Sequence, residues 1–419
     1  MLSLLVYFVS NIVSSGVPFL LSIVLARFLP VPEFGQIALY TTQISLAGIW
    51  VGFSAYASVQ ARLFLDPDRF PSYLSSSVMF HLLGLFGTLA LLLILRTSFV
   101  SWASLPLWAL CAAAVSAFFQ CLLNMHLLLA QGKGWKTRYL ILQLVQSIAL
   151  LLLVPLFAIG LDMGWHGYVV GQVVQLLLVT PWNLFTLIRR FGLAWHVDWA
   201  YLKANFRFGM SLLPHNLAGF VTVGYDRIYV GAHAGADALG IYSIMLQFGM
   251  MISLVVSALN KVYTPWLYER LRNRSEWHRI AVSTWLGVLA VVVFCAVSLP
   301  LMSLAIVPLL GEKFQAGSDL LVWMVLGGMV NGIYLLVTNM IFFSERIWML
   351  SIASVSGATV KWFLLPVLFA SFGLSGAAAS NLVGLSVTAT LVTIFVVVIY
   401  DRRVLFGNSF SVLSRSRRV

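Results

Sequence analysis

The side chains of this sequence that could carry chemistry are charges inside apolar segments. Asp226 and Arg227 are adjacent in one such segment, and Lys361 interrupts another. At 1.5 Å per residue, Lys361 lies roughly 20 Å from the start of its segment, beyond easy snorkelling range, and Asp226 lies roughly 7 Å from the end of its own. Charges inside lipid-spanning helices are expensive and by default indicate a functional site.

The composition explains why such charges stand out. The chain has 419 residues, of which 61% are hydrophobic and only 9% are charged, and its mean hydropathy is +0.97. A soluble domain is about 25% charged. Most of this chain is therefore expected to face lipid or other membrane helices. The first apolar run, 2–28, is too long for the hydrophobic region of a signal peptide and predicts a first membrane span.

The apolar runs predict an all-α polytopic membrane protein. A membrane span requires about 20 apolar residues, and by that length the sequence predicts twelve transmembrane helices. They are expected at 2–28, 34–64, 73–95, 104–130, 139–160, 166–188, 208–231, 239–264, 280–306, 317–343, 348–370 and 375–400.

The basic residues alternate between successive connections. Of the 25 Lys and Arg residues, 19 lie in the connections that follow even-numbered spans and in the C-terminal tail. Cytoplasmic loops carry the excess of Lys and Arg. Both termini are therefore predicted to be cytoplasmic. The net charge of +12 is then a signal of topology and does not indicate a nucleic-acid partner.

The two halves of the chain are similar at one corresponding place. Gly35 lies at the start of the second predicted span, and Gly240 lies in a similar setting at the start of the eighth. With an even number of spans in each half, the halves form a parallel repeat, as in several transporter folds. The predicted organisation is an N-terminal six-helix bundle at 1–188, a cytoplasmic linker at 189–207, a C-terminal six-helix bundle at 208–400 and a basic cytoplasmic tail at 401–419.

The predicted linker is the largest connection. Its apolar residues Leu193, Trp195, Trp199 and Leu202 predict a short helix on the cytoplasmic membrane surface. The alternative is a polar linker with some aromatic anchors.

Five segments, spread over essentially the whole chain, carry a family resemblance. The chain resembles the Wzx-type O-antigen and polysaccharide flippases of the multidrug/oligosaccharidyl-lipid/polysaccharide (MOP) exporter superfamily. The matching segments are VPFLLSIVLARFLPVPEFGQIALY at 17–40, YDRIYVGAHAGADALGIYS at 225–243, ALNKVYTPWLYERL at 258–271, PLLGEKFQAGSDLL at 308–321 and FGLSGAAAS at 372–380.

This resemblance implies a fold, an activity and partners. The implied fold is MATE-like, with two six-helix bundles in a V around a central cavity. The implied activity is transfer of an undecaprenyl-pyrophosphate-linked oligosaccharide from the cytoplasmic to the periplasmic leaflet of the inner membrane, for O-antigen or related surface polysaccharide synthesis. Partners would be this lipid-linked oligosaccharide, membrane lipids and other polysaccharide-assembly proteins.

Such a substrate gives the intramembrane charges a purpose. Its pyrophosphate is anionic, and arginine binds phosphate through two hydrogen bonds whereas lysine acts as a point charge. Lys361 is therefore predicted to face the cavity. The alternative is a structural lysine that pairs with carbonyl groups or with an acid of a neighbouring helix.

Asp226 lies in a polar stripe of its helix formed by His215, Gly219, Thr222, Asp226 and Tyr229. This stripe is predicted to face the cavity, with Arg227 and Asn216 beside it. The alternative is an interfacial Asp226–Arg227 pair that holds the helix at the membrane rim. If an ion gradient drives transport, Asp226 and His215 are the candidates for protonation.

Two further cations lie near the ends of spans. Lys261 is predicted to meet the incoming pyrophosphate at the cytoplasmic side or, alternatively, to anchor its helix there. Arg27 lies near the periplasmic end of the first span, where it either lines the cavity or snorkels to the interface.

The sequence contains no motif that predicts an enzyme. It has no phosphate-binding Gly-Lys-Ser/Thr loop and no His/Cys metal spacing, so neither a cofactor nor a metal site is expected. Two other functions stay open. One is a multidrug or small-molecule exporter of the same superfamily, and the other is a membrane-embedded polysaccharide polymerase or ligase, for which a large periplasmic loop is lacking.

The alternation of loops can be tested by cysteine labelling. In a variant without the native cysteines, single cysteines at positions 134 and 235 should react with a membrane-impermeant maleimide from opposite sides of the membrane. Labelling of both positions from the same side would contradict the twelve-span topology.

Overall fold

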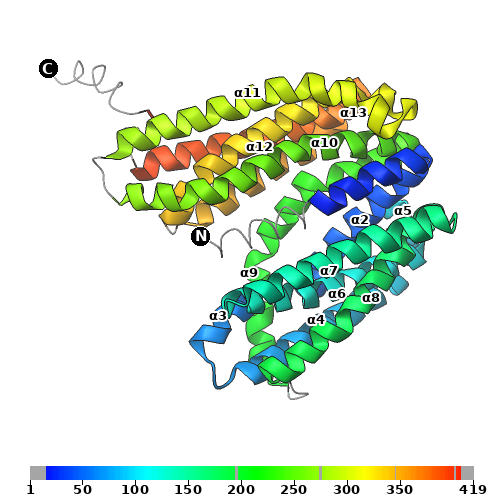
Figure 1. Cartoon of the computed structure of the whole chain (residues 1–419), viewed down its shortest axis with the longest axis vertical. Coiled ribbons are helices and arrows are strands. Elements are labelled where there is room, and N and C mark those ends of the chain that lie inside the picture. Colours follow the sequence, from blue (N-terminus) through cyan, green and yellow to red (C-terminus); the bar gives the residue numbers. More distant parts are fainter. Residues whose placement is uncertain (1–15, 194–196, 273–275, 345, 401–402, 407–419) are drawn as a thin grey trace. The chain divides into compact units, whose positions relative to one another are not determined.

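The described part of the chain is helical throughout. The computed structural model describes residues 16–193, 197–272, 276–344, 346–400 and 403–406, and every regular element in them is a helix (Figure 1). The chain forms two compact units. The first comprises the described residues up to Phe220 together with Arg227–Ser243, and the second comprises Val221–Asp226 and the described residues from Ile244 onward.

The first unit is built around one central helix, at Leu107–Gly132. Its elements are Gly16–Phe28, α2 (Val31–Gly52), α3 (Tyr56–Leu65), α4 (Phe70–Ile94), α5 (Arg96–Ala103), α6 (Leu107–Gly132), α7 (Lys136–Pro155) with a π-helical turn at Leu156–Gly160, α8 (Gly164–Phe191) and most of α9 (Trp199–Val223). In their most apolar stretches, 56% of α6 is buried but only 22% of α4 and 17% of the helix at Lys136–Gly160. The apolar outer helices thus present most of their surface to lipid.

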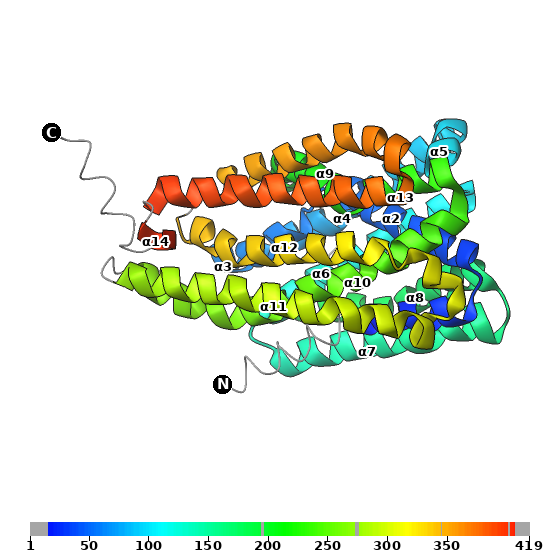
Figure 2. The same cartoon turned by 90° about the horizontal axis from the view of Figure 1, so that it is seen from above.

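The second unit has the same character. It contains most of α10 (Tyr225–Leu271), α11 (Trp277–Leu310), a 3₁₀ helix (Glu312–Gly317), α12 (Leu320–Phe343), α13 (Trp348–Tyr400) and the short α14 (Arg403–Phe406). Helix α12 lies between α11 and α13 (Figure 2). It is the more buried helix, at 50% of its most apolar stretch against 28% for α11.

Two long helices are each broken at a glycine. Gly235 interrupts α10 with φ 82°, and Gly373 interrupts α13 with φ 56°. Backbone conformations with positive φ are costly for residues with a Cβ, so glycine is the residue that suits them. These positions lie in the connections predicted between spans 7 and 8 and between spans 11 and 12.

The all-helical membrane fold is confirmed, whereas the count of twelve spans stays a prediction. The described residues contain eight helices that are long and apolar enough to cross a membrane, or nine if the bent pair α2–α3 is one span. The second span, expected as one run at 34–64, is bent by 43° between α2 and α3. Phe53 and Ser54, which have positive φ, form this bend. The expected first span, 2–28, lies partly outside the described residues.

The predicted linker is partly helical. Helix α8 ends at Phe191, and α9 begins at Trp199 and continues into the seventh predicted span. Residues 194–196, which include the predicted anchor Trp195, lie outside the described residues. The division of the chain into bundles at 189–207 therefore stays a prediction.

The two glycines that the repeat equates lie against each other. A Cβ built on Gly35 of α2 would overlap the carbonyl oxygen of Ala236, and a Cβ on Gly240 would overlap that of Val31. Both sites belong to the first unit. The absence of side chains at Gly35 and Gly240 therefore allows the backbones of α2 and α10 to come into contact.

This crossing predicts the effect of one methyl group. Gly35→Ala should lower the melting temperature of the purified protein, because overpacking a tight contact costs about 1–3 kcal/mol. Gly48→Ala on the same helix is the matched control, since no atom lies within 4 Å of its added Cβ. Equal melting temperatures for the two variants, measured in the same detergent, would contradict this close contact.

Candidate functional site

The second unit contains a buried ion pair inside an apolar environment. The Lys361 side chain is 1% exposed and that of Asp226 is 0% exposed, and Lys361 Nζ lies 3.1 Å from Asp226 Oδ2. The same ammonium donates to the backbone oxygen of Thr222 at 2.6 Å and to Asn381 Oδ1 at 3.0 Å. One positive and one negative charge make the site neutral, and three oxygen atoms satisfy the ammonium.

A helix break supplies two of these oxygen atoms. Helix α9 ends at Val223 and α10 begins at Tyr225, with Gly224 between them. The last carbonyl groups of a helix have no N–H partner within it, so the oxygen of Thr222 is available to Lys361. Asp226 lies in the first turn of α10, where the helix dipole stabilises a negative charge.

The turn within α13 brings the other groups together. Lys361 precedes the break at Gly373 and Asn381 follows it, so the two arms of α13 contribute facing side chains. Gly384 lies where the arms touch, and a Cβ built there would be only 2.9 Å from the Cβ of Lys361. The absence of a side chain at Gly384 therefore leaves room for Lys361.

The structure unites two residues that the sequence placed on separate segments. Lys361 was predicted roughly 20 Å from one membrane face and Asp226 roughly 7 Å from the other, so in a hydrocarbon core about 30 Å thick Asp226 was predicted nearer the membrane rim than Lys361. Their pairing matches the structural alternative that the sequence left open for Lys361. Their roles towards a substrate or an ion stay predictions.

Arg227 and Asn216 lie in another environment, within the first unit. Arg227 Nη1 is 3.5 Å from Thr42 Oγ1, and Asn216 Nδ2 donates to Ser54 Oγ at 2.9 Å. Both side chains are partly buried. Arg227 connects α10 to α2, and Asn216 connects α9 to the bend that follows α2. Their predicted contact with a substrate is untested.

The three remaining predicted residues have exposed side chains. They are Arg27, His215 and Lys261. An exposed side chain at Arg27 or Lys261 is compatible with a role in the cavity and with a position at the membrane interface. The cavity role of these two cations therefore stays a prediction, as does ion coupling by His215.

Asn381 was not among the residues predicted from the sequence. It is 9% exposed, and its amide oxygen accepts a hydrogen bond from the ammonium of Lys361. The available signal was an amide inside the predicted span 375–400, since such a group requires a hydrogen-bond partner within the membrane.

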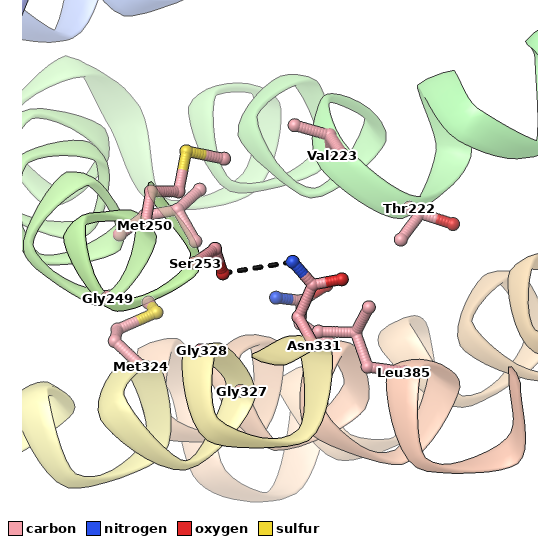
Figure 3. Close-up of a pocket in the computed structure, with 12 residues that line it drawn as sticks. Thr222, Val223, Gly249, Met250, Ser253, Met324, Gly327, Gly328, Asn331 and Leu385 are labelled. Atoms are coloured by element: carbon pink, nitrogen blue, oxygen red, sulfur yellow. Dashed lines mark hydrogen bonds between the residues drawn. The ribbon is translucent and has the colours of Figure 1, made fainter. Parts of the chain in front are cut away.

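A pocket lies beside the ion pair, within the second unit. Figure 3 shows residues that line it. Its volume is about 120 Å³. It shares Thr222 and Asn381 with the ion-pair site. The other lining residues are Val223, Leu246, Gly249, Met250, Ser253, Met324, Gly327, Gly328, Asn331 and Leu385.

The ion pair predicts a non-additive effect on stability. Asp226→Asn or Lys361→Met alone leaves one buried charge without its counterion, and breaking a buried pair in this way costs about 3–5 kcal/mol. The double variant removes both charges, so its melting temperature should lie above that of either single variant. Lys261→Met, at an exposed lysine, is the control. If the melting-temperature losses of the two single variants simply added up in the double variant, a direct pair would be contradicted.

Comparisons with known proteins agree with this architecture. The polysaccharide biosynthesis protein family matches residues 3–271. The protein named Lsg locus putative protein 1 of Haemophilus influenzae is 24% identical over 370 residues, which are 84% of this chain and 86% of that protein.

Two solved structures show the fold. The lipid II flippase MurJ in an inward closed conformation has a TM-score of 0.72 and 12% identity, over 100% of this chain and 93% of MurJ. An inward-facing multidrug resistance MATE family transporter of the MOP superfamily has a TM-score of 0.65 and 16% identity, over 97% and 96% of the two chains. The chain is thus a multi-pass membrane protein with a MATE-like fold, and it belongs to the polysaccharide biosynthesis protein family.

Proposed function

We propose that this protein is a flippase for a lipid-linked oligosaccharide. Its substrate would be an undecaprenyl-pyrophosphate-linked repeat unit of O-antigen or a related surface polysaccharide, moved from the cytoplasmic to the periplasmic leaflet of a bacterial inner membrane. The observation that supports this function is the polar site of Lys361, Asp226 and Asn381 inside an apolar unit of a family member. Both termini are cytoplasmic in this proposal.

The charges of the site suit an anionic substrate if the Asp226 carboxylate can take up a proton. Lys361 is neutralised by the Asp226 carboxylate, so a pyrophosphate oxygen has to compete with that carboxylate for the ammonium. A proton on Asp226 would release Lys361 to the phosphate without leaving a buried charge uncompensated. Asp226 is thus the ion-coupling residue of the proposal, and Lys361 is the phosphate-binding residue.

Movement of the two bundles relative to each other would expose the substrate path to each side in turn. Parallel repeats in other transporters move largely as rigid bodies. Alternating access of this kind completes the proposed mechanism.

A multidrug exporter is the second candidate, favoured by the fold shared with a multidrug resistance MATE family transporter. Residues 1–188 contain only four acidic side chains, Glu33, Asp66, Asp68 and Asp162, so the first half of the chain offers few counterions to a cationic drug. Drug susceptibility of a deletion strain distinguishes the two functions.

Deletion followed by lipid analysis tests the proposed flippase. The deletion strain should accumulate one lipid-linked repeat unit and lose surface polysaccharide, while its susceptibility to cationic drugs stays at the wild-type level. A plasmid-borne wild-type gene should reverse both changes. A strain with normal surface polysaccharide, no accumulated lipid and increased drug susceptibility would overturn the proposal in favour of the exporter.

Substitution of Lys361 tests its role in the site. Lys361→Ala should lower surface-polysaccharide export roughly tenfold or more, the factor that about 1.4 kcal/mol of lost transition-state stabilisation gives. Membrane levels of the variant are compared with wild type by immunoblotting. Export at the wild-type level by a variant present in the membrane would show that Lys361 is structural or dispensable.

A further inference from the structure

The pocket beside the ion pair presents an oriented hydrogen-bond donor. An ammonium has only donors, so the oxygen of the Asn381 amide has to face Lys361 Nζ. Asn381 Nδ2 is consequently directed elsewhere, and it lies 4.0 Å from the position of a Cβ on the pocket residue Gly327. Lys361 therefore fixes a donor at the wall of the pocket.

A second amide presents an acceptor. Asn331 Nδ2 donates to Ser253 Oγ at 2.9 Å, which leaves Asn331 Oδ1 as the acceptor. Figure 3 shows the Asn331 amide with its nitrogen towards Ser253 and its oxygen directed away from it. Each amide thus uses one of its two polar atoms. Within the described chain, the other two atoms, Asn331 Oδ1 and Asn381 Nδ2, have no hydrogen-bond partner.

The remaining lining of the pocket is mostly apolar. Met250, Met324 and Leu385 contribute side chains, and Gly327 contributes none. A water molecule takes about 10–15 Å³ of cavity volume. A pocket of about 120 Å³ therefore has room for a group of several non-hydrogen atoms.

We propose that this pocket binds the acetamido group of an N-acetylated sugar in the lipid-linked substrate. The acetamido oxygen accepts from Asn381 Nδ2, its N–H donates to Asn331 Oδ1, and its methyl group packs against Met250, Met324 and Leu385. The inference rests on the proposed flippase function and deepens it, because it assigns a chemical feature to the transported sugar.

Other small groups fit this pattern less well. A carboxylate lacks the donor that Asn331 Oδ1 requires, and an ammonium lacks the acceptor that Asn381 Nδ2 requires. A hydroxyl group supplies both functions but leaves the apolar wall without a partner. A site built to hydrogen-bond a specific group discriminates strongly against analogues that lack it, because its own polar atoms are then left unpaired.

Gly327 offers a way to fill the pocket without disturbing the helices. A Cβ there would lie 3.8 Å from Leu385 Cδ1, an ordinary van der Waals distance. At the adjacent Gly328, by contrast, a Cβ would overlap the carbonyl oxygen of Gly249 on α10. Gly327→Ala therefore narrows the pocket while the α10–α12 packing stays intact, and alanine also suits a helix better than glycine.

Protection of a pocket cysteine tests the inference on the purified full chain. Met250→Cys, in a variant whose native cysteines are replaced by alanine, is labelled with N-ethylmaleimide in lipid nanodiscs in the presence of N-acetylglucosamine or glucose. N-acetylglucosamine should halve the labelling rate at a concentration roughly tenfold lower than glucose, the ratio that about 1.4 kcal/mol gives. Adding Gly327→Ala should abolish this difference.

Gly87→Ala, at a site with no atom within 4 Å of the added Cβ, should keep the difference between the two sugars, and melting temperatures report whether each variant is folded. Equal protection by both sugars, or none by either, overturns the acetamido pocket. Because this assay measures binding without transport, its result is independent of lipid accumulation in the deletion strain, so the pocket and the flippase function can fail separately.

Discussion

The second unit depends on one requirement, that the ammonium of Lys361 be satisfied inside an apolar protein. A buried charge without partners costs several kcal/mol, so its three oxygen partners have to be in place when the helices pack. They come from the end of α9, the first turn of α10 and the second arm of α13. Satisfying this one side chain therefore joins the α9–α10 junction to α13, although Thr222 and Lys361 are 139 residues apart in the chain.

Breaks in the helices make this arrangement possible. A continuous helix through Gly224 would engage the carbonyl of Thr222 in its own backbone hydrogen bond, and Lys361 would lose its shortest contact. The turn at Gly373 returns the chain so that Asn381 faces Lys361. Irregular backbone at membrane depth is tolerated where protein groups satisfy it, which is the situation here.

Much of this fold could be predicted from the sequence, because apolar length and glycine position are local signals. The breaks at Gly235 and Gly373 lie in predicted connections. The predicted depths, by contrast, placed Asp226 nearer the membrane rim than Lys361. Their partnership could not be predicted, since a lone charge in an apolar helix shows that a partner is needed but not which helix supplies it. The bend at Phe53 was missed because residues other than glycine adopt its positive φ.

The ion pair and the pocket are not independent, because they share the amide of Asn381. While Lys361 donates to Asn381 Oδ1, the amide nitrogen has to serve the pocket. If the ammonium turns to a phosphate, that oxygen loses its donor and the amide is no longer held in one orientation. The pocket then no longer offers a fixed donor. Coupling between two binding events is reciprocal, so a group bound in the pocket would in turn favour the arrangement in which Lys361 keeps its present partners. In the proposed mechanism, release of the sugar and capture of the phosphate would thereby be linked through the side chain of Asn381.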